Sequence, residues 1–290
     1  SEHEGMPGFG GNGEPQAIQF EWRDDSVERG RRGASSSRLV EMPRILLIGG
    51  SDSSGGAGVF ADVKTCHDLG CEASVAVTAV TAQNSRKHYH SHVLPEHTLK
   101  SQLFAVGDSA VDAVKIGMLP NLESIEVVRD FLLAHSFGKV VLDPVFSSSS
   151  GGSLSTEEGI ASLDHCLFPY VDLITPNLFE ATRLVKQAGL QAESQEELAA
   201  CCLELGANAV LIKGGHYSGE TCTDLFVTDD EQSYSFSRKR IPGGSKVRGT
   251  GCRLASAITC FQARGSELKD AVGQACEYLA SYITGQMGSA

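Results

Sequence analysis

From residue 44 onward, short apolar runs alternate with longer segments whose hydrophobic residues recur at helical spacing. The apolar runs are rich in β-branched residues and predict buried strands at residues 44–48, 74–80, 113–116, 139–142, 173–175 and 209–213. The amphipathic segments predict helices at residues 61–69, 96–106, 122–134, 179–187, 195–205, 252–262 and 268–283. A polar, histidine-rich segment near residues 88–92 predicts a solvated loop, and residues 222–227 with 234–237 predict a hairpin.

Repeated strand–helix units predict an α/β fold with a mainly parallel central sheet and helices on both faces. Ligands of such sheets bind beyond the carboxyl ends of the strands. Glycine, amide and carboxylate residues follow the predicted strands of this chain, so one edge of the sheet is expected to hold most of the chemistry. These residues are Gly49 to Asp52, Gln83 and Asn84, Gly117 and Met118, Asp143 and Pro144, Pro176 and Asn177, and Gly214 to His216.

The first 43 residues differ from the rest in being rich in glycine, serine and mixed charge. So little apolar surface cannot offset the entropy lost on ordering, which predicts a disordered or loosely packed extension. Residues 44–290 are then expected to form one folded domain.

Composition narrows the classes of function. Lys and Arg total 24 against 36 Asp and Glu, a net charge of −12, which disfavours broad binding to nucleic acid. No apolar run approaches the ~18–20 residues of a membrane span. Nine cysteines without a C-x-x-C spacing favour reduced thiols in a cytoplasmic enzyme over disulfides or a zinc site.

Two glycine-rich segments are candidates for contact with a ligand. Residues 49–58 join a strand to a helix, and their glycines let the backbone approach a ligand closely. They match neither a Walker A loop nor G-x-G-x-x-G, and a flexible turn is the alternative interpretation. Gly249-Thr250-Gly251-Cys252 opens a helix, where free backbone N–H groups can form an anion hole and the helix dipole is expected to lower the pKa of the thiol. A glycine-rich helix start with a buried cysteine is the alternative.

Two further groups suit a nucleotide and a cation. Lys213 ends a buried strand beside Gly214 and Gly215, which suits a phosphate, although a snorkelling lysine explains it too. Asn177 and Glu180 lie one helical turn apart, which suits a hydrated Mg²⁺ ion and equally an N-cap with a first-turn glutamate.

Taken in order, these motifs resemble the hydroxymethylpyrimidine and phosphomethylpyrimidine kinases of thiamine synthesis, members of the ribokinase-like superfamily. The resemblance covers residues 44 to 284. It rests on Gly50-Ser51-Asp52-Ser53-Ser54-Gly55-Gly56-Ala57-Gly58, Ala61-Asp62-Val63-Lys64-Thr65, Thr78-Ala79-Val80-Thr81-Ala82-Gln83-Asn84, Lys115-Ile116-Gly117-Met118-Leu119, Leu142-Asp143-Pro144-Val145, Ile174-Thr175-Pro176-Asn177, Glu180-Ala181, Ile212-Lys213-Gly214-Gly215-His216 and Gly249-Thr250-Gly251-Cys252.

The resemblance implies a ribokinase-like kinase domain over residues 44–290 that forms a homodimer and uses ATP and Mg²⁺ as cofactors. It implies transfer of the γ-phosphoryl group of ATP to 4-amino-5-hydroxymethyl-2-methylpyrimidine and then to its monophosphate. The implied pyrimidine pocket is Gly50, Asp62, Gln83, Met118 and Val145. Lys213, Asn177 and Thr250 would bind ATP, Glu180 and Asp143 would bind the metal, and Gly249, Gly251 and Cys252 would form the catalytic centre, with the thiol as base.

Two alternatives to this function stay open from the sequence. Pyridoxal kinase is the first, because close relatives in the superfamily phosphorylate vitamin B6 aldehydes, and Gln83 favours the aminopyrimidine because its amide both donates and accepts. A non-catalytic ligand sensor with the same fold is the second. The chain also has Lys246-Val247-Arg248 where the family commonly has Asn-Thr-His. This added charge predicts that Arg248 binds a polyphosphate or the substrate's phosphate, with a solvated basic loop as the alternative.

Overall fold

The computed structural model describes residues 42–107, 109–148, 151–215 and 219–288, so the predicted extension lies almost wholly outside the described residues. The described residues form a nine-stranded sheet in the order β3-β2-β1-β4-β5-β6-β7-β8-β9. The strands are β1 (Arg44–Asp52), β2 (Glu72–Gln83), β3 (His88–Val93), β4 (Ala113–Ile116), β5 (Val140–Leu142), β6 (Leu173–Ile174), β7 (Ala209–Ile212), β8 (Thr221–Thr228) and β9 (Ser233–Lys239).

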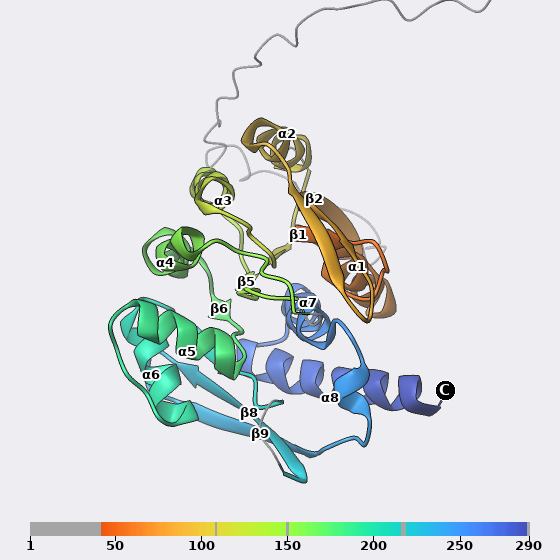
Figure 1. The fold of residues 1–290 in the computed structure, drawn as a ribbon, viewed down its shortest axis with the longest axis vertical. Helices are drawn as coiled ribbons and strands as arrows, with labels where there is room; N and C mark the ends of the chain where they lie inside the picture. Colours follow the sequence, from red (N-terminus) through yellow and green to blue (C-terminus); the bar gives the residue numbers. More distant parts are fainter. Residues whose placement is uncertain (1–41, 108, 149–150, 216–218, 289–290) are drawn as a thin grey trace, which may run out of the picture.

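Helices cover both faces of this sheet (Figure 1). Helices α1, α7 and α8 pack on one face, and α2 to α6 pack on the other. The helices are α1 (Gly58–Asp68), α2 (Glu96–Gly107), α3 (Leu122–Ala134), α4 (Glu157–Cys166), α5 (Leu178–Gln187), α6 (Gln195–Glu204), α7 (Thr250–Ala263) and α8 (Leu268–Gly288), with short 3-10 turns at Phe168–Tyr170 and Gly244–Lys246.

The predicted α/β architecture is confirmed. Strands β2, β1, β4, β5, β6 and β7 pair in parallel, and the antiparallel strands β3, β8 and β9 extend the two edges. The chain order reverses at β1, which lies between β2 and β4. Such a reversal leaves a crevice beyond the carboxyl ends of the two central strands, where α/β proteins bind their ligands.

The apolar run that opens the domain shows why these strands read as continuous hydrophobic segments. Leu46 and Ile48 of β1 pack into the core beneath α2 to α6, whereas Ile45 and Leu47 pack into the core beneath α1 and α7. All four side chains are fully buried, so both faces of the strand must be apolar. Within the described residues, no helix combines the length and apolar character that crossing a membrane requires.

The loop predicted near residues 88–92 is wrong, because this segment is the edge strand β3. It pairs antiparallel with β2, which extends to Gln83 rather than ending at residue 80. Most side chains of β3 are exposed, so the segment carries no alternation of buried and polar positions. Backbone hydrogen bonds to β2 stabilise a strand that its side chains do not signal.

Candidate active site

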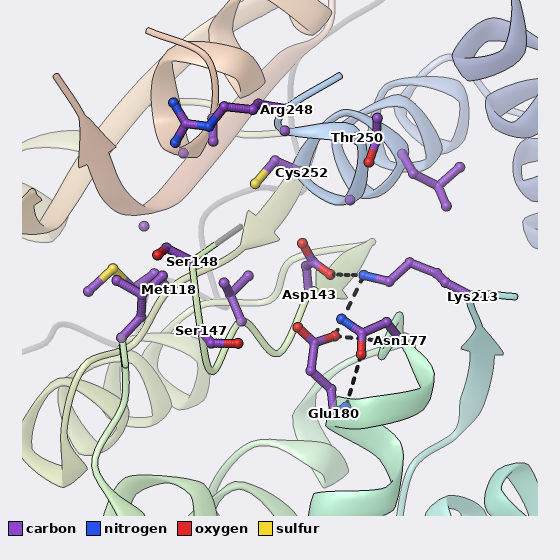
Figure 2. Close-up of a pocket in the computed structure, with 18 of the residues that line it drawn as sticks. Met118, Asp143, Ser147, Ser148, Asn177, Glu180, Lys213, Arg248, Thr250 and Cys252 are labelled. Carbon is purple, nitrogen blue, oxygen red and sulfur yellow. Dashed lines mark hydrogen bonds and ion pairs between the residues drawn. The ribbon is translucent and has the colours of Figure 1, made fainter. Parts of the chain in front are cut away.

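A cavity of about 540 Å³ opens beyond the carboxyl ends of the parallel strands. All of the site residues predicted from the sequence line it, and they come from segments spread along the chain from β1 to α7. They are Gly50, Asp62, Gln83, Met118, Asp143, Val145, Asn177, Glu180, Lys213, Gly249, Thr250, Gly251 and Cys252. Figure 2 shows the side chains of α7 above the cavity and those that follow β5, β6 and β7 below it.

The two glycine-rich segments meet at one wall of the cavity. Gly249 precedes α7 with a φ of 70°, in the left-handed region that favours glycine. A Cβ atom at this position would lie 2.3 Å from the carbonyl oxygen of Gly56. Only glycine therefore allows the start of α7 to approach the β1–α1 loop this closely. The predicted anion hole and the predicted ligand loop form one surface.

The first turn of α7 also faces the predicted phosphate and metal residues. A Cβ atom on Gly251 would lie 3.3 Å from Nζ of Lys213 and 3.6 Å from Oδ2 of Asp143. The free N–H groups of the helix start, a lysine and a carboxylate thus surround the same space. This combination can bind a polyphosphate and a cation together.

Lys213 forms ion pairs with two carboxylates across the cavity floor. Its Nζ lies 2.6 Å from Oδ1 of Asp143 and 3.8 Å from Oε2 of Glu180 (Figure 2). Burial works to lower the pKa of Lys213, but the two carboxylates outweigh it and raise that pKa. Burial raises the pKa of Glu180 to about 7, against the opposing pull of Lys213. The floor therefore holds more buried negative charge than one lysine stabilises.

Asn177 and Glu180 form a capping box at the start of α5. Oδ1 of Asn177 accepts a hydrogen bond from the backbone N–H of Glu180 at 3.0 Å, and Oε2 of Glu180 accepts one from the N–H of Asn177 at 2.7 Å. The N-cap interpretation of this pair is confirmed. It holds Glu180 in place below Lys213 without excluding a second partner, because each side chain keeps acceptor capacity.

The oxygen atoms of Asp143 and Glu180 suit a hard cation such as Mg²⁺. No cluster of three or more Asp, Glu, His or Cys side chains able to hold a metal occurs among the residues that the structure describes. Two carboxylates beside a phosphate-sized space fit Mg²⁺ in particular, because this ion is usually bound by one or two carboxylates together with water and substrate phosphates.

A buried ion pair that lines the same cavity was not predicted. Nζ of Lys115 lies 2.8 Å from Oδ2 of Asp62, and Oγ of Ser256 donates to Oδ1 of Asp62 at 2.8 Å. Both charged side chains are 1% exposed. Burial raises the pKa of Asp62; burial lowers that of Lys115, but Asp62, Cys252 and Asp143 raise it more strongly. A lysine within the apolar run of β4 was the available signal.

The expected lowering of the Cys252 pKa is wrong. Cys252 is the third residue of α7 and points into the cavity (Figure 2). Burial raises the pKa of its thiol to about 11, and the carboxylates of Asp62 and Asp143 add to the rise. Lys115 and the backbone N–H of Gly58 oppose it. Desolvation of the thiolate thus outweighs the stabilisation that the start of the helix gives a negative charge in its first turn.

The end of the cavity beside β1, β2 and β4 is a slot formed by a small apolar cluster together with polar side chains. Met118 and Val145 pack with Ala79 and Leu154. A Cβ atom on Gly50 would lie 2.5 Å from Sδ of Met118, so the glycine leaves room for the thioether. Gln83, 8% exposed, lines the cavity as well. The slot suits a flat ring with polar groups on one edge.

A second unpredicted ion pair lies at the opposite end, beside β7, β8 and β9. Nη1 of Arg238 lies 2.6 Å from Oδ2 of Asp224, whose Oδ1 accepts from the N–H of Gly214 at 2.8 Å. Asp224 is buried on the core-facing side of β8. A carboxylate at a core position of a strand was the signal that could have identified it.

Comparisons with known proteins agree with this geometry. A family model described as phosphomethylpyrimidine kinase matches residues 52–289. A hydroxymethylpyrimidine/phosphomethylpyrimidine kinase of Haemophilus influenzae is 38% identical over 250 residues, 85% of this chain and 93% of that protein. The crystal structure of a phosphomethylpyrimidine kinase from Clostridium difficile is similar with a TM-score of 0.71 and 34% identity, over 84% of this chain and 100% of that one. A Staphylococcus aureus pyridoxal kinase in complex with AMP-PCP and pyridoxal is similar with a TM-score of 0.72 and 29% identity, over 83% and 88% of the two chains.

Proposed function

Because this chain belongs to the phosphomethylpyrimidine kinase family, we propose that it transfers the γ-phosphoryl group of ATP to 4-amino-5-hydroxymethyl-2-methylpyrimidine and then to the monophosphate. The observation that carries this proposal is that every residue which the family resemblance assigns to substrate, ATP, metal and catalysis lines one cavity. The relative in complex with AMP-PCP supports ATP as the phosphoryl donor.

The arrangement of groups along the cavity supports in-line transfer of a phosphoryl group from ATP to the alcohol. The slot around Gln83 and Met118 would hold the pyrimidine, and Lys213 would bind the ATP phosphates on the other side. The N–H groups that begin α7 would stabilise the negative charge on the transferred group, since preorganised donors act most strongly where water is excluded. Cys252, between the two ends, would accept the proton of the attacking alcohol. The proton leaves the hydroxyl as the new P–O bond forms and the bond to ADP breaks.

Asp143 and Glu180 would hold Mg²⁺, with Asn177 fixing the orientation of Glu180. When bound, this ion neutralises charge on the β- and γ-phosphates. Lys213 forms ion pairs with both carboxylates and would offset part of their negative charge before ATP and Mg²⁺ bind.

An ATP-consumption assay on a panel of hydroxymethylpyrimidines and pyridoxal tests the proposal. We expect turnover on the aminopyrimidine and its monophosphate to exceed turnover on pyridoxal. Gln83→Leu should lower kcat/KM on the aminopyrimidine by roughly tenfold to a hundredfold, because it leaves the polar edge of the ring unpaired. Any pyridoxal turnover should change much less. Turnover confined to pyridoxal would support the pyridoxal kinase alternative, and absence of turnover on every alcohol would support a sensor.

We also propose that residues 44–290 form the whole kinase domain. All residues that line the cavity lie between Gly49 and Leu279, which supports this boundary. A chain that begins at Glu41 should therefore keep the melting temperature and the kinase rate of the full chain. A large fall in melting temperature on truncation would show that the first forty residues pack onto the domain.

We further propose that the protein is a homodimer. The outer edge of β3 supports self-association, because edge strands usually carry charged residues that prevent pairing and this one has none besides histidine. Tyr89 on β3 is 62% exposed. Light scattering should give twice the chain mass, and Tyr89→Lys should shift the mass toward that of the monomer. A single chain mass at micromolar concentration would contradict the proposal.

A further inference from the structure

Gln83 carries a side-chain amide whose orientation decides which edge of a ring it can recognise. Its two ends differ only in being an acceptor and a donor, so neighbouring groups must fix which end points where. In this structure Nε2 donates to Oγ1 of Thr81 at 3.0 Å, and Oε1 accepts from Nη2 of Arg248 at 3.1 Å. Each end therefore has one partner.

Both partners enforce the same orientation. The hydroxyl of Thr81 donates to the carbonyl oxygen of Ser51 at 2.7 Å, so its oxygen is left only as an acceptor for Nε2 of Gln83. The guanidinium of Arg248 has donors alone, so a flipped amide would place N–H groups against N–H groups. The resulting chain of hydrogen bonds runs in one direction from Arg248 through Gln83 and Thr81 to Ser51.

Arg248 is itself held by a buried carboxylate. Its Nη2 lies 3.2 Å from Oδ2 of Asp52, and its Nη1 donates to Oγ of Ser54 at 2.6 Å. Oγ of Ser54 donates in turn to Oδ1 of Asp52 at 2.8 Å. Asp52 is fully buried, and the side chain of Arg248 is 14% exposed. The positive charge of Arg248 is thus balanced inside the protein, which makes it a poor candidate for the phosphate contact predicted from the sequence.

We propose that Arg248 is a positioning residue that sets ring specificity through Gln83. The locked amide keeps one N–H and one lone pair of Oε1 for a ligand. This adjacent donor and acceptor complement a ring nitrogen beside an exocyclic amine, as in an aminopyrimidine. Pyridoxal lacks an amine next to its ring nitrogen, so the same lock disfavours it. This inference rests on the proposed pyrimidine kinase activity.

A double-mutant cycle on the full-length protein tests the proposal. Arg248→Met, Gln83→Leu and the double variant are compared by kcat/KM on the hydroxymethylpyrimidine. Arg248→Met should lower kcat/KM by roughly tenfold to a hundredfold, as expected for an unpaired polar group. It should cost no more than about threefold in a Gln83→Leu background, since residues that act through one another are not additive. The KM for ATP should stay within about threefold of the parent.

Two further variants keep the test decisive. Arg248→Lys retains the charge beside Asp52 but loses the planar fork that reaches both Ser54 and Gln83, so it should keep the melting temperature and still lose pyrimidine turnover. Lys246→Met removes a charge from an exposed position of the same loop and should match the parent. If the losses in kcat/KM of Arg248→Met and Gln83→Leu multiply in the double variant, or if Arg248→Met raises the KM for ATP tenfold, the positioning role of Arg248 is overturned while the proposed function stands. Absence of pyrimidine turnover by the parent would overturn the proposed function and this inference with it.

Discussion

Cys252→Ala is expected to lower kcat on the hydroxymethylpyrimidine by about 10²- to 10⁴-fold, the usual contribution of a general base. The N–H groups that open α7 belong to the backbone and survive the substitution, so binding of the phosphates should persist. The KM values for ATP and for the alcohol should therefore change by no more than about threefold. Steady-state kinetics of the purified variant measure both quantities.

Two variants control this prediction. Cys252→Ser keeps a small polar group at the helix start but replaces the thiol with a hydroxyl that ionises far less readily, so it should lose nearly as much kcat as the alanine variant. Cys201→Ala removes a thiol of α6 outside the cavity and should match the parent. A kcat for Cys252→Ala close to that of the parent would show that the thiol only fills the start of α7.

The raised pKa of Cys252 gives the same residue a signature in the pH profile. A base acts in its deprotonated form, and with a pKa of about 11 the thiolate fraction rises about tenfold for each pH unit below that value. The kcat/KM of the parent should therefore still rise with pH above pH 8, beyond the titration of Glu180 near pH 7. Cys252→Ala should lack this limb, and Cys201→Ala should retain it.

The repeated strand–helix pattern made most of the fold predictable. Strands such as β1 are apolar on both faces, and their helices have an apolar stripe, so local periodicity carries the signal. Helix α4 was not predicted. Thr156 caps it by accepting a hydrogen bond from the N–H of Gly159, and Ile160 and Leu163 lie on its buried face. The run of serine and glycine residues before it is typical of a loop and obscured where the helix begins. Strand β3 was not predicted because it depends on pairing with β2 rather than on burial.

Most of the candidate site was predictable for a topological reason. In a parallel sheet the residues after each strand meet at one edge, so Gln83, Asp143 and Asn177 could be brought together without knowledge of their contacts. The pairing of side chains was not predictable. Lys115 and Asp62 are 53 positions apart in the chain, and Arg248 and Gln83 are 165 apart. The pKa of Cys252 was mistaken for the same reason, since the helix dipole is local whereas burial depends on the whole fold.

Lys115→Met is expected to lower the free energy of unfolding by about 3–5 kcal/mol, the usual result of removing one partner of a buried ion pair. The substitution leaves the Asp62 carboxylate in the core with Ser256 as its remaining partner. Urea denaturation measures the loss, and Lys186→Met on the exposed side of α5 should leave stability within about 0.5 kcal/mol of the parent. Because the pKa of folded Lys115 is raised, its contribution is present at neutral pH and declines only above roughly pH 10.4, the ordinary value for lysine.

The double variant Asp62→Asn with Lys115→Met separates charge from packing. In the double variant neither side chain is charged, and the asparagine can still accept a hydrogen bond from Ser256. The unpaired buried carboxylate of the Lys115→Met variant is therefore absent. We expect the double variant to be more stable than Lys115→Met alone, since burying a pair of charges costs about as much as their attraction returns. Its kinase rate should nevertheless stay low, because Asp62 lines the substrate slot and Lys115 opposes the rise in the pKa of Cys252. If the double variant is less stable than Lys115→Met, the pair stabilises the fold through its shape rather than through its charge, and the two substitutions should then act additively in urea.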